Sequence, residues 1–197
     1  MGGIKFATDD LVADRRPADF AVQFHVHAIL RKQAQLPRHD HRLAVNLEPR
    51  REEQLEFRPL FTDELLFITS PLHPWARAGK VERSAIPREH YILYGKGSYT
   101  FQMIEDYFRA DQVVLHSQLD LGNIDAIKEL VKLGLGISVL APWTARKELS
   151  EKSLVALPLG KRKLRRRWGV LHWRGRWLSL AEETFIGLCE SVCEKIR

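Results

Sequence analysis

The chain has 197 residues, of which 45% are hydrophobic and 28% charged, which is ordinary for a globular protein able to bury a normal core. It has no apolar run long enough to span a membrane and no secretory signal at its N-terminus, so we expect a cytoplasmic protein without membrane contact. The net charge of +6 leaves nucleic-acid binding open.

Residues 1–54 are poorly patterned. Only residues 20–30 have enough apolar content for a strand or a short helix. The histidine pairs His25/His27 and His39/His41 could in principle ligate a metal, but no cysteine or carboxylate cluster supports them. We therefore expect no metal site and no cofactor.

From Leu55 onward, short apolar runs alternate with helical patterns. The expected strands lie at 65–69, 91–94, 113–118, 137–140, 154–157 and 168–173. The expected helices lie at 99–109, at 124–133 (ending at Gly134), at 141–149, and from Ser179 to the end. This alternation predicts an α/β architecture with mostly parallel strand pairing.

The last helix carries the clearest start signal. Residues 179–182 (SLAE) form a capping box, in which serine and glutamate satisfy each other's free backbone amides. The apolar spacing predicts a buried stripe of Phe185, Leu188, Val192 and Ile196. The two cysteines, Cys189 and Cys193, are four residues apart, which does not suit a disulfide, and we expect them to be small buried side chains.

Two helix starts that directly follow strands are candidate binding sites. The first includes Gly97, Ser98, Tyr99 and Thr100, and the second includes Asn123 and Ile124. Free amides and the positive dipole end of a helix suit a carboxylate or a phosphate, although simple N-capping by Ser98 and Asn123 is an equally good explanation. Because open α/β sheets bind ligands at the carboxyl ends of their strands, the two sites together favour a small polar ligand.

A basic run follows at residues 161–167. It is expected to be a solvated connection between strands, and the alternative is a nucleic-acid or anion patch. That patch would consist of Lys161, Arg162, Lys163, Arg165, Arg166 and Arg167.

Motifs of common enzyme classes are missing from the sequence. There is no G-x-S-x-G elbow, no P-loop, no G-x-G-x-x-G and no H-E-x-x-H, and His73 lies between two prolines in a rigid turn. We therefore do not expect an enzyme.

The segments LFTDELLFI (60–68), PLHP (71–74), GSYT (97–100) and LGLGISVLAP (133–142) follow one another along the chain, and in this order they resemble the effector-binding (substrate-binding) domain of LysR-type transcription regulators. Residues 60–68 (LFTDELLFI) with 71–74 (PLHP) resemble one stretch of that family, and 133–142 (LGLGISVLAP) resemble another. Residues 97–100 (GSYT) fall where the family has a serine and a threonine that open a second-lobe helix. Residues 154–159 and 176–179 complete the pattern, which runs from about residue 55 to residue 196.

The resemblance implies a periplasmic-binding-protein-like (type 2) fold with two α/β lobes and an effector cleft between them. Ser98, Tyr99 and Thr100 would line the second-lobe side, with Asn123 and Ile124 nearby. Residues 55–159 would form a complete second lobe, and residues 160–197 the return strand and C-terminal helix of a partial first lobe. Residues 1–54 do not match, and we interpret them as the result of truncation or a frameshift, with a linker or disorder as the alternative.

The resemblance also implies function and partners. A small, anionic effector would bind in the cleft, and the protein would associate with copies of itself. The family's winged helix-turn-helix is missing from this sequence, so we expect no sequence-specific DNA binding by this chain alone. The alternatives are a solute-binding protein or an enzyme on the same fold, or a basic accessory protein that binds nucleic acid.

Overall fold

The computed structural model describes residues 43–50 and 53–194. Residues 20–30 and the two histidine pairs lie outside this part of the chain. The strands are β1 (Ala44–Leu47), β2 (Leu55–Thr69), β3 (Tyr91–Tyr94), β4 (Ser117–Leu121), β5 (Ser138–Leu140), β6 (Val155–Leu157) and β7 (Leu164–Trp173). The helices are α1 (Pro74–Ala78), α2 (Tyr99–Arg109), α3 (Ile124–Lys132), α4 (Arg146–Ser150) and α5 (Leu180–Glu194), with short 3₁₀ helices η2 (Arg83–Arg88) and η3 (Pro142–Ala145).

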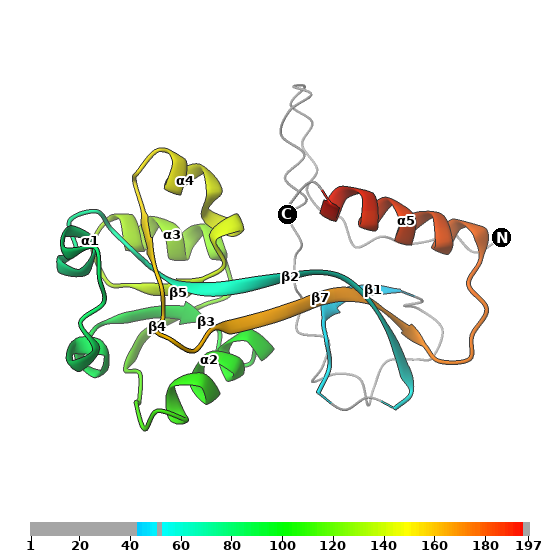
Figure 1. The fold of residues 1–197 in the computed structure, drawn as a ribbon, viewed down its shortest axis with the longest axis horizontal. Helices are drawn as coiled ribbons and strands as arrows, with labels where there is room; N and C mark the ends of the chain where they lie inside the picture. Colours follow the sequence, from blue (N-terminus) through cyan, green and yellow to red (C-terminus); the bar gives the residue numbers. More distant parts are fainter. Residues whose placement is uncertain (1–42, 51–52, 195–197) are drawn as a thin grey trace.

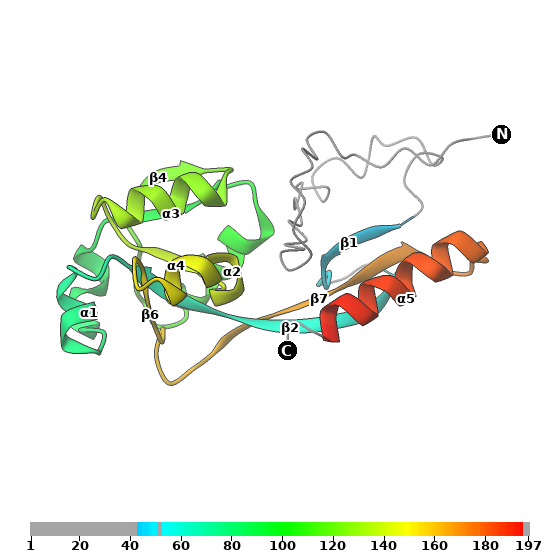
Figure 2. The ribbon, with the colours of Figure 1, turned by 90° about the horizontal axis from the view of Figure 1, so that it is seen from above.

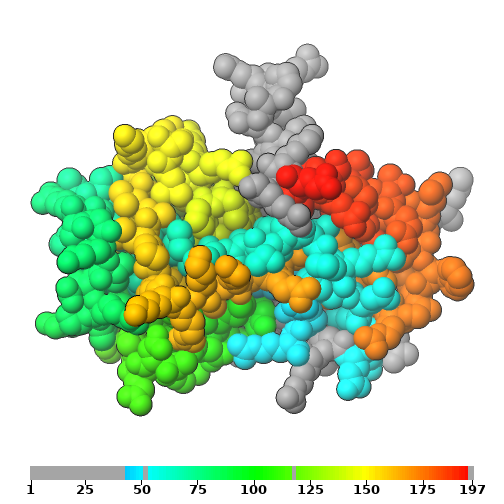
Figure 3. Space-filling view, in the orientation of Figure 1, coloured from blue at the N-terminus to red at the C-terminus, as the bar shows by residue number. Residues whose placement is uncertain are grey.

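Two long strands, β2 and β7, organise the fold. They pair antiparallel from Leu55 opposite Trp173 to Leu65 opposite Leu164, with an irregularity in β2 between Pro59 and Phe61. Figures 1 and 2 show that these strands join two groups of elements. We call the group with β1 and α5 the first lobe and the group with α1 to α4 the second lobe. Atoms of both strands reach the surface between the lobes (Figure 3).

The second-lobe sheet mixes strand directions. β5 and β6 pair antiparallel with β2, whereas β3 pairs parallel with β4 and, through Tyr91 and Ile137, parallel with β5. In the first lobe, β1 is antiparallel to β7. The expectation of mostly parallel pairing is therefore wrong, because the apolar content of a strand reports that both its faces are covered and does not report its direction.

Apolar side chains cover both faces of the second-lobe sheet. One cluster joins β2, β3 and α2 around Phe67, Tyr91 and Ile104, and the other joins β2, β5 and α3 around Ile68, Ile127 and Leu140. A separate cluster packs α5 onto the crossing strands of the first lobe; its buried members are Leu47, Leu60, Phe61, Trp168, Val170, Ile186 and Cys193.

The capping box of α5 is confirmed, but the predicted buried stripe is not. Ser179 N donates to Glu182 Oε2 at 2.7 Å, and Glu182 N donates to Ser179 Oγ at 3.4 Å. Glu182, also held by Arg176, lies in the interior, so the buried face runs through Ile186 and Cys193. Leu188 is consequently 61% exposed. Phe185 and Val192 are half-buried, and Ile196 lies beyond the described residues.

The other predicted elements agree with the structure to different degrees. The strand at 91–94 and the helix at 99–109 are confirmed to the residue. β2 and β7 begin earlier than predicted, the strand expected at 113–118 is shifted to 117–121, and the helix expected at 141–149 is divided into η3 and α4. β1 lies inside the segment that looked poorly patterned. Within residues 43–50 and 53–194, none of the helices has the length and apolar character that crossing a membrane requires.

Candidate functional site

Three strands of the second lobe end at one edge of the sheet. Because β3, β4 and β5 are parallel, the loops that follow them lie side by side at their carboxyl ends. Gly95 N donates to Leu121 O at 3.1 Å and ties the loop after β3 to the end of β4. The structure therefore brings the two predicted helix starts, at residues 97–100 and 123–124, to the same edge.

The side chains at these helix starts are used as caps. Ser98 Oγ accepts from Phe101 N at 3.1 Å, and Asn123 Oδ1 accepts from Asp125 N at 2.8 Å and Ala126 N at 3.1 Å. Capping is thus the observed role of Ser98 and Asn123. The first backbone amides of α2 and α3, at Tyr99, Thr100 and Ile124, have no acceptor one turn earlier in their own helix, and they mark the positive ends of the two helices.

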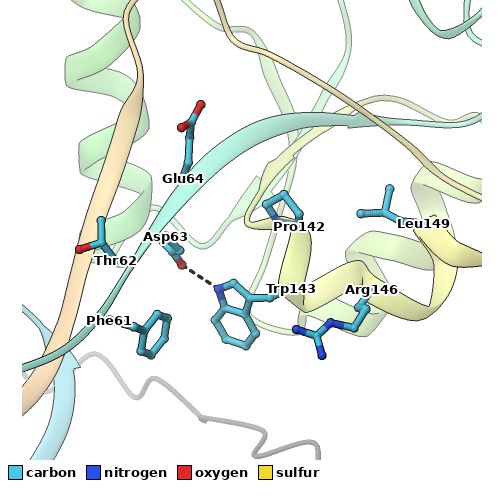
Figure 4. Close-up of a pocket in the computed structure, with 8 residues that line it drawn as sticks. All are labelled: Phe61, Thr62, Asp63, Glu64, Pro142, Trp143, Arg146 and Leu149. Atoms are coloured by element: carbon cyan, nitrogen blue, oxygen red, sulfur yellow. Dashed lines mark hydrogen bonds between the residues drawn. The ribbon is translucent and has the colours of Figure 1, made fainter. Parts of the chain in front are cut away.

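A hollow of about 390 Å³ lies where η3 and α4 meet β2 (Figure 4). Pro142 and Trp143 enter it from the carboxyl end of β5, and Arg146 and Leu149 enter it from α4. The β2 side is formed by Phe61, Thr62, Asp63 and Glu64. Arg146 is exposed and makes no ion pair with another residue of the described chain, so its charge is available to a ligand. The hollow therefore offers aromatic and apolar walls, the cation of Arg146, and two carboxylates that already have cationic partners, Asp63 with Arg166 and Glu64 with Lys163.

A buried carboxylate lies next to this hollow. Asp63 Oδ2 accepts from Trp143 Nε1 at 2.8 Å, from Trp168 Nε1 at 3.0 Å and from Arg166 Nη2 at 2.5 Å. Asp63 Oδ1 accepts from Arg166 Nε at 2.9 Å, and Arg166 Nη1 donates to Thr100 Oγ1 at 3.0 Å. We call Asp63, Thr100, Trp143, Arg166 and Trp168 the Asp63 cluster.

The two charged members of the cluster, Asp63 and Arg166, are buried. Asp63 is 8% exposed and Arg166 only 3%. Burial disfavours the charge of Arg166, but the hydrogen bonds and the charge of Asp63 outweigh it and raise the pKa of Arg166. Burial also raises the pKa of the Tyr94 hydroxyl, so this phenol stays neutral. The cluster thus links β2 and β7 through a buried ion pair between Asp63 and Arg166.

The basic run does not form one continuous patch. From Leu164 to Trp168 the β7 side chains alternate, so Arg166 points into the interior while Arg165 and Arg167 point outward. Including Arg166 in a surface patch was therefore wrong. Lys163 lies 3.0 Å from Glu64, Arg167 lies 2.7 Å from Glu48, and Arg162 lies 3.3 Å from Asp111. Lys161 is exposed. Acidic partners thus neutralise much of the run.

Thr100 and Arg166 of the Asp63 cluster were among the predicted site residues, but the other members of the cluster and the residues of the hollow were not. Phe61, Asp63 and Pro142 were noted only as part of the resemblance. Trp143 and Arg146 were not noted at all. One signal was present, because Asp63 and Arg166 are opposite charges and each has apolar residues two positions away on both sides, as a charge on the apolar face of a strand would.

The sequence matches the family described as "LysR substrate binding domain" over residues 19–194. It is 26% identical over 152 residues to the HTH-type transcriptional activator CmpR of Synechocystis, covering 74% of this chain and 50% of CmpR. It is 33% identical over 134 residues to the HTH-type transcriptional regulator YeiE of Escherichia coli K12, covering 67% of this chain and 45% of YeiE. The chain thus spans about half the length of these relatives.

Solved structures show the same fold. The CcmR regulatory domain of Synechocystis, in complex with 2-PG, superposes with a TM-score of 0.73 at 28% identity, covering 84% of this chain and 78% of that domain. The effector-binding domain of QuiR, in complex with shikimate, superposes with a TM-score of 0.70 at 19% identity, covering 85% of this chain and 78% of that domain. The two-lobed, periplasmic-binding-protein-like fold is therefore confirmed.

Proposed function

The chain belongs to the LysR substrate-binding domain family, and from this premise we propose that it senses a small anionic effector for a cytoplasmic, DNA-binding transcription regulator. The effector binds at the carboxyl edge of β3, β4 and β5, where the second lobe faces the first. Binding changes how the lobes are arranged, and this change reaches the DNA-binding part of the intact regulator. The chain performs no catalysis in this role.

One observation carries the proposal. Two helix N-termini lie at the carboxyl ends of β3 and β4, and the hollow lined by Trp143 and Arg146 begins at the carboxyl end of the neighbouring β5. Backbone amides at helix starts and a guanidinium group are the donors that suit a carboxylate or phosphate. The ligand of the CcmR domain, 2-PG, supports this direction because that domain is similar to this chain in sequence as well as in fold.

The effector contacts divide between backbone and side chains. Gly97, Tyr99, Thr100 and Ile124 would contribute backbone amides, since Ser98 and Asn123 already cap their helices with their side chains. Arg146 would pair with the anionic group and Trp143 would pack against the rest of the molecule.

The division of the chain and its partners complete the proposal. Residues 55–159 act as the second lobe and residues 160–197 as the return into the first, preceded by residues 1–54. Self-association through the first lobe, and DNA contact through a helix-turn-helix of the intact regulator, are the partner interactions we propose. Lys161, Arg162, Lys163, Arg165 and Arg167 add at most weak, salt-dependent attraction to DNA, since several of them have acidic partners.

Calorimetric titration of the chain with 2-PG, with inorganic phosphate alongside, tests the proposal. We expect 2-PG to bind and Arg146→Gln to weaken its binding at least about tenfold, because one charge-assisted hydrogen bond is lost. Arg77→Gln is the matched control, because Arg77 is an equally exposed arginine in the last turn of α1. Failure of both anions to bind, or equal binding by the Arg146 variant, would contradict the proposed site.

A further inference from the structure

We propose that Asp63 is the positioning residue of the effector cleft, because its one buried carboxylate holds the two walls of the cleft in register. One wall is Trp143, which lines the hollow, and the other is the first turn of α2, reached through Arg166 and Thr100. The inference rests on the proposed function, since it concerns the same cleft, but its test does not require a ligand.

The donors around Asp63 are coupled because they share acceptor atoms. Oδ2 alone receives Trp143 Nε1, Trp168 Nε1 and Arg166 Nη2, all within 3.0 Å. An ionised carboxyl oxygen has few lone-pair positions, so a change in one of these bonds alters the length and direction of the others. A displacement of Trp143 therefore changes the hydrogen bonds that Arg166 and Trp168 donate to Asp63.

The coupled groups belong to different parts of the molecule. Trp143 follows β5, Thr100 begins α2, and Asp63 and Arg166 belong to the crossing strands β2 and β7. Trp168 belongs to the first-lobe core, where its ring stacks on Phe61 at 6.0 Å with 10° between the planes. Trp143 meets the same two rings edge-on, at 6.1 Å from Phe61 and 6.4 Å from Trp168. Whatever moves Trp143 thus also disturbs the packing between the lobes.

The direction of the effect follows from burial. Asp63 is nearly enclosed, so a carboxylate that loses one donor cannot replace it with bulk water without opening the structure. A ligand that leaves the bond between Trp143 and Asp63 intact stabilises the present lobe arrangement. A ligand that pulls Trp143 away favours a rearranged one.

The test perturbs one wall and observes the other. In the full chain labelled with ¹⁵N-tryptophan, Thr100→Val removes the hydroxyl bonded to Arg166 while keeping the size of the side chain. We expect the indole N–H resonances of Trp143 and Trp168 to shift together. Neither threonine nor valine has an aromatic ring, so the substitution itself adds or removes no ring current. A role limited to stabilising α2 would lower the stability without moving these two resonances.

Gln102→Ala is the matched control, because Gln102 is exposed on α2 and lies outside the Asp63 cluster. Unchanged indole resonances in Thr100→Val, or shifts as large in Gln102→Ala, would overturn the inference. The test does not use Asp63→Asn, because that substitution would leave Arg166 buried without its charge partner and could unfold the protein. If the indoles shift while 2-PG fails to bind, the proposed ligand class falls and the positioning role of Asp63 stands.

Discussion

Replacing Gly169 by alanine should push β7 away from β2 and lower the stability of the protein. Gly169 lies in β7 between Asn46 of β1 and Pro59 of β2. A Cβ atom there would lie 2.4 Å from the carbonyl oxygen of Arg58 and 2.5 Å from the ring of Phe57. The nearest atom is backbone and cannot rotate away, so the strands must move apart. Overpacking of this kind costs about 1–3 kcal/mol of unfolding free energy.

Urea unfolding followed by tryptophan fluorescence and far-UV circular dichroism measures this cost. Thermal unfolding gives a second reading, because in a chain of this length each kcal/mol of lost stability lowers Tm by about 2–4 °C. Gly187→Ala is the matched control, because Gly187 is an exposed glycine within α5 whose added Cβ would meet no atom within 4 Å. It should raise the unfolding free energy by about 1 kcal/mol through helix propensity. A Gly169→Ala variant as stable as the original chain would refute the reasoning from strand spacing.

Three further substitutions address buried polar groups. Lys128→Met leaves Glu148, 3.0 Å away, buried without its cation, and should lower the unfolding free energy by about 3 kcal/mol in urea titrations. The hydroxyl of Ser138 is buried without a hydrogen-bond partner among the described residues. Ser138→Ala should therefore raise the unfolding free energy by about 1 kcal/mol, which is seen as a higher thermal midpoint. Burial opposes ionisation of Glu182, but hydrogen bonds from Ser179 and Arg176 lower its pKa to about 2. The stability that ionised Glu182 adds is therefore complete above its usual pKa of 4.5 and is lost as the pH falls toward 2. Glu182→Gln should flatten that part of the curve of unfolding free energy against pH. The control Glu190→Gln, at an exposed position of α5, should leave it unchanged.

Much of the second lobe could be predicted from local signals. Ser98 and Asn123 begin helices because their side chains satisfy backbone amides, and that preference is visible without tertiary structure. The long strands were harder. The early part of β2 alternates apolar and charged residues only from Leu55 to Arg58 before Pro59 interrupts the pattern, and the early part of β7 appeared as a basic run. Their structure depends on pairing with each other across the sequence, which composition does not reveal.

The candidate site was predictable at its backbone and unpredictable at its side chains. The helix starts follow strands, so their position at the carboxyl edge could be expected from the α/β pattern. The hollow requires Trp143 and Arg146 to meet residues of β2 about 80 positions earlier in the chain, as in the bond from Trp143 to Asp63. No local sequence pattern predicts a contact between residues so far apart in the chain.

The pairing of β2 with β7 has a consequence for the order in which the protein folds. Leu65 and Leu164 face each other although they are 99 positions apart in the sequence, and the second lobe fills most of that interval. Bringing the ends of so long an unstructured segment together costs about 4 kcal/mol of loop entropy. If the second lobe forms beforehand, its own folding holds the two ends near each other and removes most of that cost. The first-lobe sheet then assembles late in folding, and its assembly depends on a second lobe that has already folded.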